Sequence, residues 1–357
     1  MRCKPYRWLA VTAALVLLAA WQSRRLAAAR RAGMPDAYEG YSADVPPALN
    51  FVMAGLGGFR GITAEILWFR VNRLQEEGRF LELVQLARWI AMLDPHTAEA
   101  WAYNAWNLAY NVSVMMARDE DRLRWVKNGI RLLRDDGLRF NPREAKLYRE
   151  LAWIYQNKIG DNLDSAHLAY KLDLARAMTP FVKADGTLDV SAADRAKLSA
   201  LRLDADRMLE TERRFGPLDW RLAESHAVYW ASQGLEHAVG AERLLCSRGV
   251  YQPLLLSVFS GRFTGDAAAG EWRVAPNYGL ALTAADFLES VCREFPSRTM
   301  SGIRLRFLAT AIQQTRRGGQ ERLTHELYRR LTSNLPEHTR KPSLDAVLQG
   351  WTPQKEN

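Results

Sequence analysis

Apolar residues recur every three or four positions along most of the chain after residue 61. Between residues 62 and 93 they form two stripes, which Gly78 separates and Asp94-Pro95 ends. This period is that of one face of an α-helix, whereas Gly and Pro interrupt helices. The pattern therefore predicts two antiparallel helices joined by a short turn. Neither helix buries its apolar stripe alone, so such a pair needs further pairs beside it.

The same unit returns several times along the chain. Further apolar stripes cover 99–116, 123–138, 147–155, 163–178, 220–233, 303–314 and 323–331. We expect each of them to be a helix, and 163–178 to be the partner of the helix that begins at 147. The punctuation is repeated as well, because Gly78 to Pro95 and Gly319 to Pro336 both span 17 residues.

This spacing resembles the tetratricopeptide repeat (TPR), in which an inter-helix glycine and a terminal proline recur in units of about 34 residues. Trp101 and Ala105 then take the places of the first aromatic and the small residue in the second repeat. Four first-helix signature positions of the third repeat are filled by Tyr148, Leu151, Ala152 and Tyr155. The resemblance covers residues 62–180 closely and 217–336 loosely. It implies an all-α fold, a right-handed α-solenoid of TPR-like helix pairs.

A longer string carries a narrower resemblance. The residues "LGGFRGITAEILWFR", followed by "LQEEGRFLELVQLARWIAMLDP", resemble a group of membrane-anchored bacterial repeat proteins to which no reaction is assigned. The resemblance implies a helical repeat body tethered at a bacterial envelope, and it implies no catalytic activity.

The N-terminus has the pattern of a targeting or anchoring segment. Basic residues precede an apolar core at positions 8–21, which is 14 residues long. A spanning helix needs roughly 17–25 residues. Arg24 and Arg25 separate this core from the small residues that follow, which disfavours cleavage. We expect an uncleaved single-pass anchor in the cell inner membrane, with a cleaved signal peptide as the alternative. Basic residues on both flanks leave the orientation of the anchor open, and they slightly favour a helical body that lies outside the cytoplasm.

These patterns divide the chain into six segments. They are an anchor or signal-like segment (1–31), a linker (32–56), TPR-like repeats one to three (57–180), a loop and long connecting helix (181–216), degenerate TPR-like repeats with an insertion at 261–280 (217–336), and a tail (337–357). The long helix is expected to begin at a capping-box variant, Ser191 to Asp194, and to reach Phe215. The loops at 181–190 and 261–280 are expected either to be plain surface insertions or to cover a groove.

Composition adds few constraints. The chain has 357 residues, 48% of them hydrophobic, and a formal net charge of +9. No block of five or more Lys or Arg occurs, which disfavours a nucleic-acid partner. The three cysteines match no zinc or CxxC spacing. Cys246 and Cys292 are expected to be buried thiols, or to pair if the body lies outside the cytoplasm.

No catalytic motif stands out. The sequence has no HExxH, GxSxG or Walker loop, and its six histidines are scattered. We therefore expect no enzyme, no cofactor and no metal, and an enzyme remains an alternative. The glycine-rich stretch at 55–61 lacks the third glycine of a dinucleotide fingerprint, because Arg60 stands there. It is expected to be the seam between tether and body, with Phe59 closing the end of the stack.

The first helices of TPR pairs line a concave groove, and the resemblance places particular residues there. Those expected to bind a partner are Trp68, Asn72, Trp106, Tyr110, Lys146, Arg149, Trp153, Gln156 and Asn157. Aromatic faces and amides suit an extended peptide. The alternative is that the tryptophans pack between repeats. The family's clamp for a terminal carboxylate is incomplete, because Trp68 and Trp153 replace its Lys and Asn.

The sequence thus predicts a membrane-tethered scaffold that binds a protein or peptide and organises an envelope-associated complex. An exported solenoid that binds a small ligand or glycan is the alternative of a different class. The oligomeric state stays open. Asn104, Asn107 and Asn111 share one helical face, and we expect them to have a structural role.

Overall fold

The computed structural model describes residues 60–333, 335 and 341–351, together with Leu17, Leu18, Trp21, Gln22 and Arg25. The expected anchor, the linker and Phe59 therefore lie outside the described residues, apart from those five positions. None of the helices in the described part of the chain has the length and apolar character that a membrane crossing requires.

The described chain is mostly helical, which confirms the all-α class. The α-helices are α3 (Arg60–Glu76), α4 (Phe80–Leu93), α5 (Ala98–Trp106), α6 (Asp119–Arg131), α7 (Leu138–Phe140), α8 (Ala145–Trp153), α9 (His167–Met178), α10 (Ala192–Ala200), α11 (Ala205–Phe215), α12 (Ala223–Leu235), α13 (Gly240–Ser260), α14 (Ala281–Glu294), α15 (Arg298–Arg317), α16 (Glu321–Ser333) and α17 (Leu344–Leu348). Segments η2 (Asn107–Val112), η4 (Leu132–Gly137) and η5 (Ile154–Gly160) are π-helical, and η3 (Ser113–Met115), η6 (Thr179–Phe181) and η7 (Tyr278–Leu280) are 3₁₀ turns. Strands β1 (Arg262–Phe263) and β2 (Val274–Ala275) form a short antiparallel hairpin.

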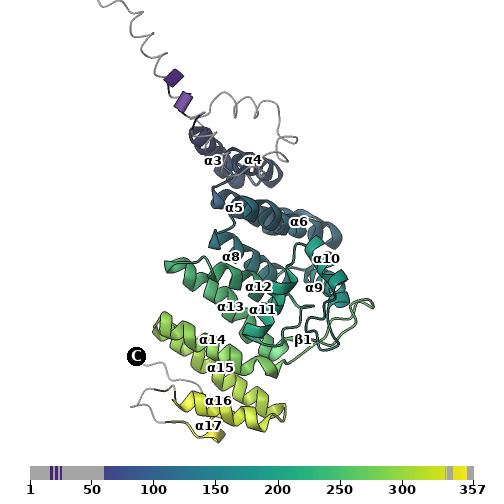
Figure 1. The fold of residues 1–357 in the computed structure, drawn as a ribbon, viewed down its shortest axis with the longest axis vertical. Helices are drawn as coiled ribbons and strands as arrows, with labels where there is room; N and C mark the ends of the chain where they lie inside the picture. Colours follow the sequence, from purple (N-terminus) through teal and green to yellow (C-terminus); the bar gives the residue numbers. More distant parts are fainter. Residues whose placement is uncertain are drawn as a thin grey trace, which may run out of the picture.

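Helix pairs follow one another along the long axis of the molecule (Figure 1). The first two pairs, α3 with α4 and α5 with α6, lie close to the predicted boundaries. Gly78 adopts φ +69° in the turn between α3 and α4, which suits glycine. Trp101 is fully buried, and its indole N–H donates to the carbonyl of Pro95 at 2.9 Å. A Cβ on Gly129 would lie 2.7 Å from the carbonyl oxygen of Ala105, so small residues let α5 and α6 approach closely.

The partner of α8 is α12, and the prediction that 163–178 fills this place is wrong. Tyr148 near the start of α8 lies 5.9 Å from His237 just past α12, while Tyr155 in η5 stacks on His226 at 5.0 Å. The two helices are therefore antiparallel neighbours. Every residue of α12 except Glu224 is buried, so this helix suits a place with neighbours on all sides.

The next helix, α13, runs in the same direction as α8. The thiol of Cys246 lies 3.9 Å from the carbonyl oxygen of Ala145, and a Cβ on Gly249 would lie 3.9 Å from Cβ of Ala152. Residues 161–222, with α9, α10 and α11, are thus an insertion within the third helix pair. Helices α13 and α14 continue the series beyond this insertion, and neither is among the helices predicted from the sequence.

The expected long helix from Ser191 to Phe215 is in fact two helices, α10 and α11. Its start is confirmed, because the Ser191 hydroxyl accepts from the backbone N–H of Asp194, whose carboxylate accepts from the Ser191 N–H. The chain then breaks at Arg202, which adopts φ 57°. Asp204 caps the second helix by accepting from the backbone N–H groups of residues 206 and 207.

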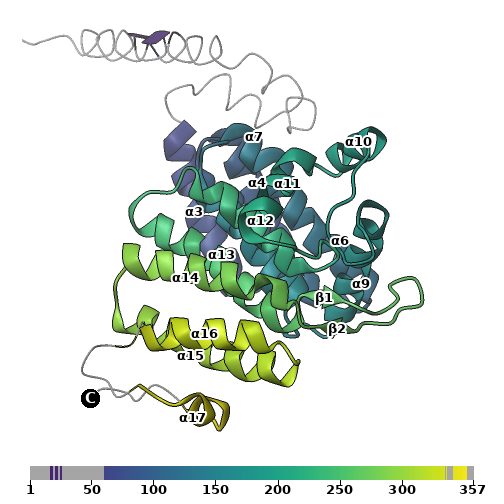
Figure 2. The same ribbon diagram turned by 60° about the horizontal axis from the view of Figure 1, so that its bottom comes forward.

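Buried Asp219 joins the two loops that the sequence marked as insertions. Its carboxylate accepts from Arg221 Nε at 2.9 Å and from the backbone N–H of Phe263 at 2.8 Å. Gly186 lies so close that a Cβ there would stand 2.1 Å from Asp219 Cγ. The hairpin also packs on α9, since Arg176 donates to the carbonyl of Ala267 at 2.7 Å (Figure 2). The loop at 261–280 is therefore fixed to the insertion, which includes the loop at 181–190.

The two ends of the described stack differ. At the C-terminal end α17 packs on α15, with Val347 fully buried and its carbonyl accepting from Gln313 at 2.7 Å. At the N-terminal end α3 leaves Ile66 and Phe69 exposed by 63% and 76%.

The two cysteines of the helical body are unpaired, buried thiols. Cys292 donates to the carbonyl of Met300 at 3.5 Å. Burial raises the pKa of both thiols, to about 12 for Cys246, so neither is a reactive thiolate at neutral pH. The possibility of a Cys246–Cys292 bridge is not realised.

Candidate partner-binding face

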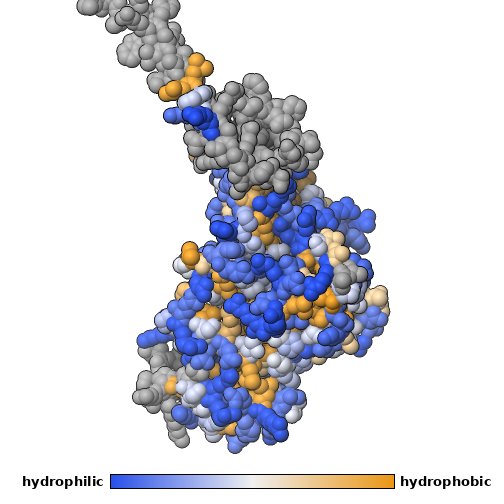
Figure 3. Space-filling view, in the orientation of Figure 1, coloured by the Kyte–Doolittle hydropathy of each residue, from blue (hydrophilic) through white to orange (hydrophobic). Residues whose placement is uncertain are grey.

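The first helices of the second and third pairs carry an exposed aromatic surface. We call the surface of Trp106, Tyr110, Trp153 and Asn157 the aromatic face. Trp106 and Trp153 are 39% and 38% exposed. Trp106 stacks on Tyr110, with ring centroids 5.5 Å apart and an interplanar angle of 24°. On the side of the molecule shown in Figure 3, apolar patches likewise interrupt a largely hydrophilic surface.

The helices place these four side chains in matching positions. Trp106 and Trp153 are each the last residue of a nine-residue α-helix that continues as a π-helical segment. Tyr110 and Asn157 each stand fourth in the π segment that follows. The wider π turn re-aims side chains, and such segments are frequent at functional sites.

Ion pairs join the first turns of successive helices beside the aromatic face. Lys146 Nζ of α8 lies 3.3 Å from Glu99 Oε1 of α5. Arg149 Nε of α8 lies 2.5 Å from Glu242 Oε1 of α13, and Arg149 also pairs with Glu150 at 2.9 Å. Both cations that the sequence placed on the partner-binding surface therefore already have carboxylate partners.

Two polar atoms of the aromatic face are buried without a hydrogen-bond partner among the described residues, the Tyr110 hydroxyl and Asn157 Nδ2. Burial, reinforced by the charge of Glu150, raises the pKa of Tyr110, so its hydroxyl remains a donor at neutral pH. Burial also raises the pKa of Glu150. An unpartnered buried donor costs about 1–3 kcal/mol, so both groups lower the stability of the fold where they stand.

The other predicted residues lie at the edges of this surface. Trp68 of α3 is half-buried and packs edge-on against Tyr103, with centroids 5.3 Å apart. For Trp68 the alternative interpretation, packing between helix pairs, therefore describes the contact. Asn72 is exposed, and Gln156 is half-buried.

Sequence reasoning missed the part of α13 that borders α8. Leu245 and Leu256 of this helix are 40% and 46% exposed, and Glu242 in its first turn pairs with Arg149. An exposed Leu is common on protein surfaces, so the sequence alone held no clear signal. Only the position of α13 beside α8 gives these residues a possible role.

Of the three asparagines expected to have a structural role, Asn107 and Asn111 make side-chain hydrogen bonds, whereas Oδ1 of Asn104 is buried without a partner among the described residues. Asn107 Nδ2 donates to the carbonyl of Tyr103 at 2.9 Å, and its side-chain oxygen accepts from Asn111 at 2.6 Å. These bonds follow the helix axis and join consecutive turns. None of these bonds involves the four residues of the aromatic face.

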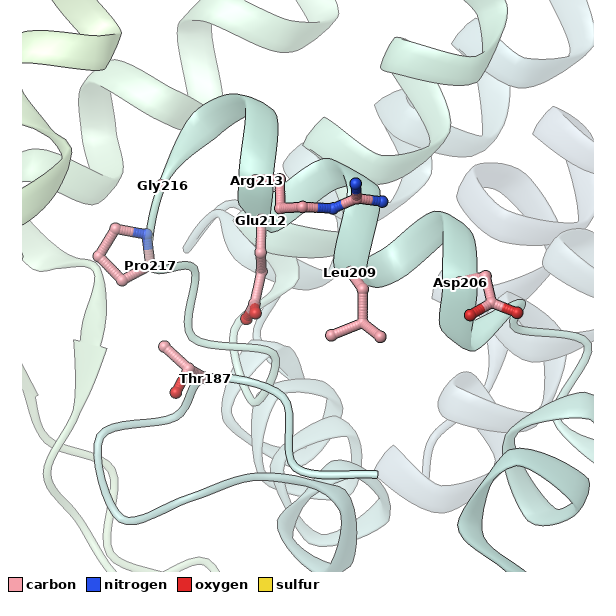
Figure 4. Close-up of a pocket in the computed structure, with 7 residues that line it drawn as sticks. All are labelled: Thr187, Asp206, Leu209, Glu212, Arg213, Gly216 and Pro217. Carbon is pink, nitrogen blue, oxygen red and sulfur yellow. The ribbon is translucent and has the colours of Figure 1, made fainter. Parts of the chain in front are cut away.

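A separate hollow of about 610 Å³ lies between α11 and the loop at 181–190 (Figure 4). Its lining consists of Thr187, Asp206, Leu209, Glu212, Arg213, Gly216 and Pro217. The Glu212 carboxylate already accepts from the backbone N–H of Leu188 at 2.9 Å and from the Trp220 indole at 2.8 Å. Burial raises the pKa of Glu212. The main contacts of Glu212 thus hold the loop at 181–190 in place.

A buried charge cluster lies at the junction of η5 and α9. Asp164 accepts from Lys158, from Arg122 at 3.2 Å and from the hydroxyl of Tyr170 at 3.2 Å. Burial opposes ionisation, yet these bonds hold the pKa of Asp164 below its usual value. Because each partner of this carboxylate is a neighbouring protein group, the cluster fastens the insertion to the stack.

Comparisons with known proteins leave the family open. No protein-family model matches the chain, and no curated protein matches its sequence. Within the described residues, no group of three or more His, Cys, Asp or Glu side chains is arranged to hold a metal ion.

Proposed function

We propose that the chain is a membrane-tethered TPR-like scaffold. In this proposal the helix pairs form a right-handed α-solenoid, and the aromatic face binds a protein or peptide partner of an envelope-associated complex. The order of the pairs supports the solenoid, since α5, α8 and α13 are successive first helices joined at their starts by ion pairs. The apolar core at 8–21 supports the tether.

One observation carries the binding proposal. Trp106 and Trp153 occupy the same position on neighbouring helices and stay more than one third exposed, and Trp153 is the only exposed residue of α8. Tryptophan is enriched among the residues that dominate binding energy at interfaces. Two partly exposed indoles in matching positions on neighbouring helices suit recognition better than packing.

Photo-crosslinking tests this function. The photoreactive residue p-benzoylphenylalanine replaces Trp153 in the full-length chain expressed in its native cells, and Phe69 in a matched control. Phe69 is also an exposed aromatic residue but lies off the aromatic face. We expect a discrete adduct from position 153 that Trp106→Ala reduces. Adducts that are the same from both positions, or absent at 153, would refute the proposal.

The tether has a test of its own. We expect the full chain to stay in the membrane fraction after a high-salt wash, and a chain that starts at residue 32 to leave it. Recovery of the full chain in the soluble fraction would exclude the tether.

The hollow beside α11 favours a second candidate function, the binding of a small ligand or glycan. It is lined by carboxylates and a guanidinium as well as by Leu209. The variant Leu209→Trp fills it without touching the aromatic face. Binding of a glycan library that this variant abolishes, together with an absence of crosslinks at position 153, would favour this candidate over the first.

A further inference from the structure

The outer face of α3 presents large apolar side chains to water. Ile66 and Phe69 stand one helical turn apart on this face and are 63% and 76% exposed. The opposite face of the helix is apolar too, because Val71 and Leu74 are buried in the core of the body. A helix that carries apolar side chains on all sides is normally covered on all sides. The body covers one side of α3, so we expect a second apolar surface against the other.

Helix α3 is the first helix of the body and lies at the end of the stack (Figure 1). It is joined to the body through its inner face, where Trp68 packs edge-on against Tyr103 and the Tyr103 hydroxyl donates to Gln75. The terminal units of a soluble solenoid need a polar outer face. Ile66 and Phe69 do not meet this need, which marks the outer face of α3 as a docking surface.

Arginines on the same face indicate the chemistry of the surface that docks there. Arg70 and Arg73 are exposed and follow Ile66 by four and seven positions, so they continue its stripe. At the end of the stripe Arg73 pairs with Glu77 at 2.9 Å. The chain as a whole is basic, with a formal net charge of +9. Apolar side chains beside arginines are typical of helices that lie in the interface of an anionic bilayer.

The place of α3 along the chain favours a bilayer over a second protein, and this step rests on the proposed function. In that proposal the apolar core at 8–21 is held in a membrane, and α3 is the first helix of the body after it. The tether therefore keeps the outer face of α3 close to lipid. Binding between tethered groups is effectively intramolecular, so a few apolar and basic side chains are enough.

We propose that the outer face of α3 lies on the surface of an anionic membrane. Ile66 and Phe69 enter the boundary between headgroups and acyl chains, and Arg70 and Arg73 extend to lipid phosphates. This contact fixes the direction in which the stack leaves the membrane, and with it the position of the aromatic face.

Spin-label accessibility in reconstituted vesicles tests this inference. The full-length chain with Cys3→Ser carries one nitroxide label, on Phe69→Cys or, as a matched control, on Val239→Cys. Val239 is 79% exposed and lies in the turn between α12 and α13, and the two remaining cysteines are buried. The vesicles contain phosphatidylcholine with about one quarter of anionic phosphatidylglycerol. We expect the label at 69 to collide severalfold more often with oxygen, which concentrates in the bilayer, than with a water-soluble nickel complex, and the label at 239 to show the reverse.

Variants of Arg70 sharpen the test. Arg70→Glu should lower the ratio of oxygen to nickel collisions at position 69 about threefold or more, whereas Arg70→Lys, which keeps the charge, should preserve it. Circular dichroism shows whether each labelled chain is folded. A label on Ile66→Cys reports on the same face from a second position and should give the same result as the label at 69.

Three outcomes would overturn the inference. Labels at 66 and 69 that meet the nickel complex as often as the label at 239 would place the outer face of α3 in water. Labels shielded from both probes would mean that protein, such as a second copy of the chain, covers this face. In both cases retention of the chain after a high-salt wash leaves the proposed tether in place. Release of the full chain by that wash overturns the tether, and this inference with it.

Discussion

Buried polar groups have hydrogen-bond partners around Asp219, whereas two of those on the aromatic face have none among the described residues. Asp219 is fully buried, and its carboxylate is bonded to Arg221 and to the Phe263 amide. On the aromatic face, the Tyr110 hydroxyl and Asn157 Nδ2 have no partner among the described residues. A saturated polar cluster fixes chain segments in place, whereas partly exposed indoles suit an external partner. Exposure of the indoles, and not the lack of a partner alone, marks the residues proposed for recognition, since Asn104 Oδ1 and His226 Nδ1 are also buried without a partner among the described residues.

The comparison predicts its largest effect at Asp219. In Asp219→Ala, Arg221 and the Phe263 amide lose their buried partner, and removing one member of such a pair costs about 3–5 kcal/mol. Urea unfolding of the full chain measures this loss. The matched control is Asp206→Ala, whose carboxylate is exposed and should cost less than about 1 kcal/mol. A loss that small at Asp219 would mean that the two insertions are not held together by this carboxylate.

A second prediction concerns pH and buried His226 of α12. Burial lowers the pKa of His226 to about 4, although its bond to the Trp220 carbonyl opposes the shift. The folded pKa lies below the unfolded value of 6.5, so the unfolded chain binds the proton first. Stability is therefore complete above pH 6.5 and falls as the pH drops from 6.5 towards 4.

At pH 5 the protonation of His226 in the unfolded chain lowers the free energy of unfolding by about 2 kcal/mol, since each pH unit within this range contributes about 1.4 kcal/mol. Unfolding by urea at pH 7 and pH 5 measures it, and His226→Gln should remove most of the difference. Identical pH dependence in the two proteins would show that the imidazole is solvated, and α12 would then not be the enclosed helix described above.

The smallest predicted effect on stability lies on the aromatic face itself. Tyr110→Phe removes a hydroxyl that has no partner among the described residues, so the free energy of unfolding should change by less than about 0.5 kcal/mol or rise slightly. The same urea titration detects it. A loss of more than about 1 kcal/mol would reveal an internal partner for the hydroxyl and weaken the contrast with Asp219.

Local patterns in the sequence were enough to predict the first two helix pairs. Gly78 and Pro95 mark real ends, and Trp101 and Ala105 fill the packing roles expected of them. The partner of α8 was not predictable in the same way. Pairing was assigned to the next apolar stripe along the chain, while the true partner, α12, follows a long insertion whose own stripes imitate a repeat.

The candidate site was predictable in part. Trp106 and Trp153 follow from helical spacing once the start of each pair is known. The unpartnered state of Tyr110 and Asn157 does not, because it depends on π-helical turns that sequence periodicity does not reveal. The pairing of Arg149 with Glu242 was also beyond reach, since it needs α13 to lie beside α8.

The most direct test of the central claim uses the double variant Trp106→Ala/Trp153→Ala. Its free energy of unfolding is measured first. Its recovery of the partner is then measured with the photoreactive residue p-benzoylphenylalanine in place of Arg149. If the two indoles serve recognition, unfolding should change by less than about 2 kcal/mol while partner recovery is lost. If they are packing residues, truncation of the two partly exposed indoles should cost more than that, towards the roughly 3–5 kcal/mol that each fully buried tryptophan contributes. Partner recovery at the wild-type level, or destabilisation of that size, would contradict the account.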